Sequence, residues 1–213
     1  MLKRTFVITI GLVSVLLAMQ ACSVKPDPQA SCNFVQNSDV QRVSWGADVP
    51  VPLYIDSEFP VEKRGAVQAA ADEWNTIAGH PLIKIVGVTN RGGGPAQDGF
   101  NIIYWMTSWD TAATNEQART TIYWTGTRIY EADVRINARA GDHQYFWSNE
   151  PQPGELDVES LLVHEFGHVL GLVHTVTAGS VMVKALAVAN ATTDFTERRT
   201  PNGFDSSSIR CEY

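Results

Sequence analysis

Three histidines and one glutamate occur at spacings that could build a catalytic metal site. His164 and His168 are four residues apart, so on a helix both side chains project from one face, about 40° apart. Glu165 lies beside them and could hold a water molecule on the metal. Gly171 permits a left-handed turn that carries His174 back to the same ion. Three protein ligands with an open fourth position describe catalytic zinc, because a structural site is closed by four.

Two other interpretations of this stretch stay open. A buried helix that carries three histidines by coincidence would leave their ring nitrogens without partners in an apolar interior, which costs free energy. A site that binds zinc but has lost its activity is the second alternative, and the intact Glu165 argues against it.

Composition indicates a globular protein of one domain. The 213 residues can bury a sizeable core, and a charged fraction of 18% with 9% aromatic residues is not that of a disordered chain. The net charge is −7, and removal of Lys3 and Arg4 with a signal peptide would make the protein still more acidic. We therefore expect no binding to nucleic acid.

The start of the chain is typical of a bacterial export signal. Lys3 and Arg4 precede an apolar run, residues 5–19, that is too short to favour a membrane-spanning helix. The small residue followed by Cys22 resembles a lipobox, in which the cysteine is lipidated. We predict a lipoprotein signal peptide at 1–21 and an exported protein that lipid anchors to the outer membrane or cell envelope. Secretion or release into the periplasm is the alternative.

The three cysteines support this interpretation by their number. If Cys22 carries lipid, Cys32 and Cys211 remain and can pair in an oxidising compartment, which would tie the start of the domain to its end. Three free thiols are the alternative. Residues 22–39 are polar and contain two prolines, so we expect a tether or short leader ahead of a folded domain at 40–213.

Sequence patterns predict strands and helices on both sides of the histidines. Strands at 49–56 and 81–88 flank a helix between Pro60 and Gly79, which favours a parallel pair of strands. Further strands are predicted at 100–106, 120–124 and 128–138. Asp157 should cap the helix that carries the histidines, and residues 205–213 should form a short last helix that places Cys211.

These features make the chain similar to the metzincin zinc peptidases, and among them to the matrixins. The residues that carry the resemblance are His164-Glu165-Phe166-Gly167-His168, Leu170-Gly171-Leu172, His174 and Ser180 with Met182. Weaker likeness lies at Ala70, Trp74, Ala132-Asp133-Val134 and Asn137. The resemblance covers roughly residues 40–213.

The resemblance implies an α+β fold of the zincin type. Its upper lobe holds a twisted, five-stranded, mostly parallel sheet and two helices. Its smaller, irregular lower lobe holds the third histidine, a Met-turn at Met182 that packs beneath the ligands, and a C-terminal helix. An antiparallel edge strand, with 120–124 as the candidate, would line the cleft and take up the substrate as an additional strand.

The implied activity is hydrolysis of internal peptide bonds in extracytoplasmic proteins or peptides. One zinc ion on His164, His168 and His174 would activate its water, and Glu165 would carry the proton to the leaving nitrogen. We expect a monomer, and a structural calcium ion near Asp98 is a further expectation. A binding module that does not cleave, and a zinc hydrolase of non-peptide amides or esters, are the rival functions.

The sequence departs from the matrixin pattern beside the methionine. Val183 and Lys184 stand where matrixins usually have tyrosine and proline, and Thr175 stands where they usually have serine. The family pattern therefore leaves the wall of the S1′ pocket undefined in this chain.

Overall fold

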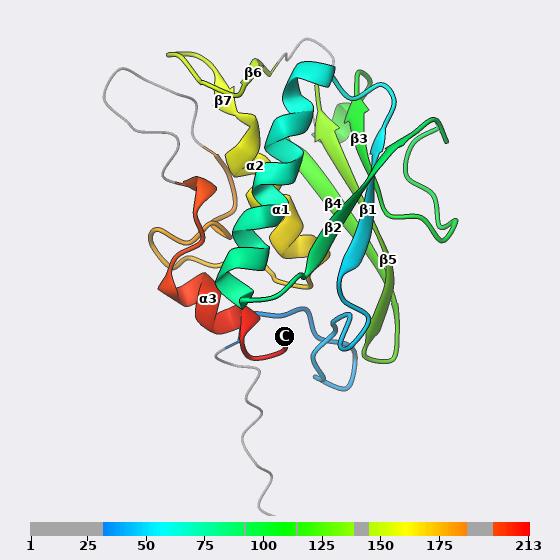
Figure 1. Cartoon of the computed structure of the whole chain (residues 1–213), viewed down its shortest axis with the longest axis vertical. Helices are drawn as coiled ribbons and strands as arrows, with labels where there is room; N and C mark the ends of the chain where they lie inside the picture. The colour runs from blue at the N-terminus through cyan, green and yellow to red at the C-terminus, as the bar shows by residue number, and fades with distance from the viewer. Residues whose placement is uncertain (1–31, 92, 114, 139–144, 187–197) are drawn as a thin grey trace, which may run out of the picture.

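The computed structural model describes residues 32–91, 93–113, 115–138, 145–186 and 198–213 (Figure 1). The predicted signal peptide at 1–21 and the lipidation candidate Cys22 lie outside the described residues. The elements are β1 (Val51–Asp56), η2 (Val61–Lys63), α1 (Arg64–Ala78), β2 (Ile83–Thr89), β3 (Ile102–Met106), η3 (Thr111–Ala113), β4 (Ala118–Thr125), β5 (Arg128–Asn137), β6 (Trp147–Ser148), β7 (Leu156–Asp157), α2 (Val158–Val169) and α3 (Gly203–Ile209).

The five longer strands form one twisted sheet in the order β2-β1-β3-β5-β4 (Figure 1). Strand β1 runs parallel to β2 and β3, and β3 runs parallel to β5. Only β4 is antiparallel, and it forms the edge beyond β5. The predicted α+β fold with a mostly parallel five-stranded sheet is confirmed, and the predicted edge strand at 120–124 is part of β4.

Helices α1 and α2 pack together against the sheet (Figure 1). On β5, Ala132, Val134 and Ile136 are fully buried in the core. Trp74 on α1 donates from its indole nitrogen to the carbonyl oxygen of Val163 on α2 over 2.8 Å. This contact fixes α2, the helix that carries the histidines, against the first helix.

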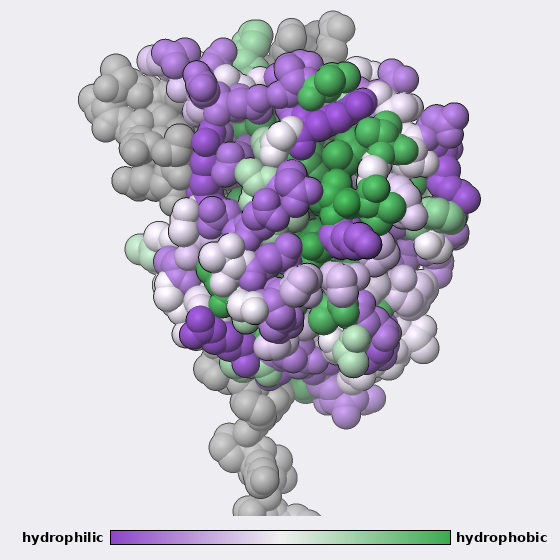
Figure 2. Space-filling model, viewed as in Figure 1, coloured by the Kyte–Doolittle hydropathy of each residue, from purple (hydrophilic) through white to green (hydrophobic). Residues whose placement is uncertain are grey.

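Apolar side chains reach the surface beside α1. Figure 2 shows them gathered over the strands next to this helix. Exposed valines of the neighbouring elements are Val61 in η2 and Val86 and Val88 on the edge strand β2. Within the described part of the chain, no helix has both the length and the apolar character needed to cross a membrane.

The predicted domain boundary at residue 40 is wrong, because residues 32–39 are part of the folded domain. Phe34 is buried and forms a β-bridge with Leu172. The amide of Val35 donates to the carbonyl oxygen of Gly171 over 2.8 Å. Residues 22–39 are polar on average, so the sequence did not indicate that the few apolar residues among them would pack. These residues bury apolar surface against the loop after α2.

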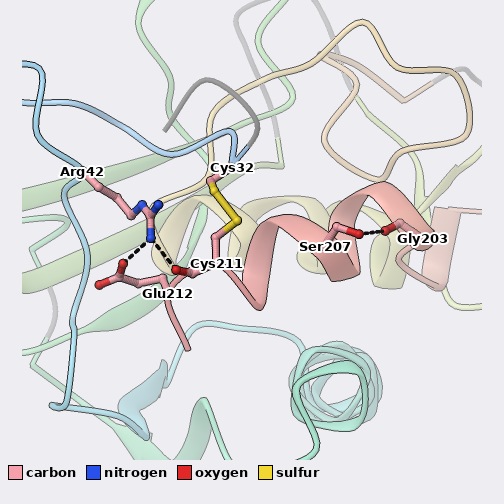
Figure 3. Close-up of a disulfide and its surroundings, with 6 residues drawn as sticks. All are labelled: Cys32, Arg42, Gly203, Ser207, Cys211 and Glu212. Atoms are coloured by element: carbon pink, nitrogen blue, oxygen red, sulfur yellow. Dashed lines mark hydrogen bonds and ion pairs between the residues drawn. A yellow bond between two sulfur atoms is a disulfide. The ribbon is translucent and has the colours of Figure 1, made fainter. Parts of the chain in front are cut away.

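A disulfide joins this N-terminal segment to the end of the chain (Figure 3). Cys211 lies two residues beyond the end of α3, and the Cα atoms of Cys32 and Cys211 are 5.9 Å apart. Arg42 adds a second link, since its guanidinium donates to the carbonyl oxygen of Cys211 and forms an ion pair with Glu212 at 2.6 Å. The predicted Cys32–Cys211 pairing is confirmed in the structure.

We predict that loss of this disulfide lowers the free energy of unfolding by about 2–5 kcal/mol, because the bridge closes a loop between residues 179 positions apart. Urea unfolding of the domain should show a lower midpoint after reduction and in the Cys32→Ser/Cys211→Ser variant. Reductant should leave the double variant unaffected. Equal midpoints for oxidised and reduced wild-type protein would contradict the prediction.

Candidate metal centre and cleft

Helix α2 begins at a capping residue, as the sequence predicts. Asp157 accepts hydrogen bonds from the Ser160 amide at 3.0 Å and the Ser160 hydroxyl at 2.6 Å. Arg199 pairs with the same carboxylate at 2.7 Å. The buried cap fixes where the helix starts and therefore which face carries His164 and His168.

Gly171 ends the helix and turns the chain back toward it. Its φ angle is +99°, its amide donates to the carbonyl oxygen of His168, and the Leu172 amide donates to that of Gly167, both over 2.9 Å. These are the two bonds of a Schellman motif. A β-carbon at Gly171 would also lie 2.7 Å from the carbonyl oxygen of Val43. Both the conformation and the close packing therefore require glycine.

The turn brings the three histidines together. The Nε2 atoms of His164 and His168 are 3.2 Å apart, and that of His174 is 3.1 Å from each. Zinc–nitrogen bonds of about 2.0–2.1 Å at tetrahedral angles place ligand nitrogens about 3.4 Å apart. The three side chains therefore fit a single zinc ion. Among the described residues, they form the one group of histidine, cysteine or acidic side chains arranged to hold a metal.

Second partners orient the two helical imidazoles. Nδ1 of His164 donates to the carbonyl oxygen of Val181, and Nδ1 of His168 donates to that of Leu172, each over 2.7 Å. Donation from Nδ1 leaves the lone pair on Nε2, which is the atom that points at the shared centre.

Burial keeps these imidazoles neutral. It lowers the pKa of His164 well below its usual value and that of His168 to about 4, and the neighbouring histidines act in the same direction. The pKa of His174 is lowered by partial burial and by the nearby charges of Lys184 and Arg198. Neutral imidazole is the form that binds a metal ion.

Glu165 is buried beside the cluster and is held by the edge strand. Its Oε2 accepts a hydrogen bond of 2.6 Å from the hydroxyl of Thr120 on β4, which also donates to the Glu165 carbonyl oxygen at 3.2 Å. Burial raises the pKa of this carboxyl to about 7, and the hydrogen bond from Thr120 opposes that shift. Thr120 was not singled out from the sequence; its place on the predicted edge strand was the available signal.

The turn at Met182 lies beneath α2. The methionine is fully buried, and a β-carbon built on Gly167 would lie 2.3 Å from its sulfur. Asp205 on α3 holds this turn, because its carboxylate accepts from the hydroxyl of Ser180 and from the Val181 amide at 3.0 Å. The predicted packing of Met182 under the ligands agrees with this arrangement, while Asp205 was not identified from the sequence.

A cleft of about 710 Å³ opens over the histidines and Glu165. Strand β4 borders it with Ala118, Thr120 and Ile122, and Lys184, Ala185 and Leu186 also line it. This volume lies within the usual range of ligand-binding clefts.

The expected calcium site near Asp98 is not supported. The carboxylate of Asp98 accepts from the Phe100 amide at 3.0 Å and lies 3.6 Å from the guanidinium of Arg91. The Asp98 carboxylate is therefore already paired with two groups of its own loop.

We predict that Gly171→Ala destabilises the domain far more than Gly79→Ala. Gly79 also has a positive φ, +79°, but nothing lies within 4 Å of a β-carbon built there. The control therefore carries the backbone strain alone, about 1–2 kcal/mol, whereas Gly171→Ala adds a backbone clash and should cost about 3 kcal/mol or more. Urea unfolding of both variants measures the difference, and equal losses would refute the packing argument.

The comparison with known protein families agrees with this site. The family model for the matrixin peptidases matches residues 100–198, which include every histidine of the cluster and Met182. A solved structure of High choriolytic enzyme 1, a hatching-enzyme zinc protease from the medaka fish Oryzias latipes, is similar at 14% identity and a TM-score of 0.35, over 85% of this chain and 94% of that one. No curated protein matches. The chain is therefore similar to the matrixin peptidases over residues 100–198, the stretch that contains the histidine cluster and the turn at Met182.

Proposed function

We propose that the protein is a zinc-dependent endopeptidase that cleaves internal peptide bonds of proteins or peptides outside the cytoplasm. The observation that carries this proposal is the convergence of three imidazole nitrogens, 3.1–3.2 Å apart, beside a buried glutamate at the base of an open cleft. Three ligands leave a coordination position for water or substrate.

The edge strand supports an extended peptide as the substrate. Strand β4 pairs with β5 on one side, and its other side borders the cleft. The outer backbone groups of an edge strand are free to pair with another chain. A substrate added there would run past Glu165, because Thr120 on β4 contacts that carboxylate directly.

Glu165 is the proposed proton carrier. Zinc, when bound, polarises the scissile carbonyl and lowers the pKa of water toward neutrality. Glu165 takes the proton of the attacking water on its carboxylate and delivers it to the leaving nitrogen. The raised pKa of this buried carboxyl, about 7, favours both acceptance and donation near neutral pH.

The Cys32–Cys211 disulfide supports action outside the cytoplasm, because such bonds persist in oxidising compartments. The proposal includes the signal peptide at 1–21 and lipid attachment at Cys22, with secretion as the alternative. Mass spectrometry of the N-terminal peptide from the membrane fraction would distinguish a lipidated from an unmodified start.

We predict that Glu165→Gln keeps one zinc ion per chain and loses about 10²- to 10⁴-fold in kcat, because the amide cannot accept the proton. The measurement uses a library of peptides, with and without chelator, and quantified zinc. Cuts that require zinc and are missing from the variant support the proposal. Near wild-type cleavage by the variant would contradict the role of Glu165, and bound zinc with peptide binding but no cuts would favour a non-cleaving module.

We also predict that Thr120→Val lowers kcat about tenfold, whereas Thr120→Ser stays near the wild-type value. Valine keeps the shape of the side chain but removes the hydroxyl that orients Glu165, a loss of about 1–1.5 kcal/mol. KM should change little in either variant, and zinc content should stay at one per chain. Equal kcat values for the valine and serine variants would show that the hydroxyl is not needed.

A further inference from the structure

One wall of the cleft is not built from a helix or a strand. Lys184, Ala185 and Leu186 line the cleft after the Met182 turn and belong to no helix or strand. Among the described residues, an isolated β-bridge joins the neighbouring Val183 to Thr175. Side-chain hydrogen bonds from Arg198 and Gln117 contact its backbone.

Arg198 binds the backbone of this wall and does not line the cleft itself. Its Nη1 donates to the carbonyl oxygen of Ala185 at 2.6 Å, and its Nη2 donates to those of Val183 at 2.5 Å and Val181 at 2.7 Å. One guanidinium thus donates to the carbonyl oxygens of every second residue from 181 to 185. Its positive charge strengthens each of these hydrogen bonds. Its planar fork of donors suits several acceptors at once, which an ammonium group does not reproduce.

The same carbonyl oxygen of Val181 connects the wall to the metal centre. It accepts from Nδ1 of His164 at 2.7 Å as well as from Arg198. A single acceptor therefore sets both the orientation of a candidate metal ligand and the position of the wall.

Gln117 holds the far end of the wall against β4. Its side-chain nitrogen donates to the carbonyl oxygen of Leu186, and its side-chain oxygen accepts from the Leu186 amide, both over 3.0 Å. The side-chain amide thus pairs with the backbone of Leu186 as a neighbouring strand would.

We propose that Arg198 is a positioning residue that fixes the wall at 183–186 relative to His164 and thereby sets which substrate side chain fits beside the scissile bond. This inference rests on the proposed peptidase function. It assigns pocket selectivity to a residue that does not itself line the cleft.

The test compares Arg198→Gln, Arg198→Lys and a matched control, Arg64→Gln. Arg64 also donates to backbone carbonyl oxygens, those of Ser57 and Phe59, but it does not line the cleft. Hydrogen exchange of the Leu186 amide reports on the wall without requiring activity. Cleavage-site profiles on a peptide library report on selectivity, and titration against a chelator reports on zinc affinity.

We expect Arg198→Gln to speed exchange at Leu186 at least tenfold relative to amides in α1, to weaken zinc binding about 10- to 100-fold, and to broaden the residue preference after the cut. Arg198→Lys should fall between this variant and wild type. Arg64→Gln should change none of the three, even if it lowers stability.

Unchanged exchange at Leu186, or an unchanged cleavage profile despite faster exchange, would overturn the inference. A wild-type protein that binds zinc but cuts nothing would instead refute the proposed function, and the exchange and zinc measurements would still decide whether Arg198 fixes the wall.

Discussion

The return of the chain after α2 is the constraint on which the site depends. His174 can meet the two helical histidines only if residues 169–173 follow one path, and both ends of the chain enforce it. Trp45 donates to the carbonyl oxygen of Val169, and Tyr213 donates to that of Leu170, both over 2.7 Å. The backbone of residues 33–35 pairs with residues 171–173, and the disulfide joins these two ends covalently.

That path of the chain holds the three imidazole nitrogens of the metal centre close together. Three nitrogen lone pairs face one another at 3.1–3.2 Å, an arrangement that is unfavourable without a cation and strongly attractive with one. The surrounding hydrogen bonds therefore prepare a ligand set that metal binding completes, so zinc affinity and folding stability are coupled. Residues remote from the metal act by holding ligands in place, as Asp205 does through the turn at Met182.

Local signals allowed much of this to be predicted from the sequence. The spacing of the histidines, the cap at Asp157 and the number of cysteines each depend on nearby residues or on simple counting. Thr120 and Arg198 gave no such signal, because they act on a carboxylate 45 positions away and on carbonyls of an irregular loop. Packing of residues 32–39 was likewise missed, since it depends on a surface that exists only once α2 and its turn have formed.

The most direct test of this account is anomalous diffraction at the zinc edge from crystals of the zinc-loaded protein. The account predicts one strong peak bonded to the Nε2 atoms of His164, His168 and His174, at about 2.0–2.1 Å from each, with no fourth protein ligand. A peak elsewhere, or a fourth side chain that closes the coordination shell, would contradict it, because a closed site has no position for water or a peptide carbonyl.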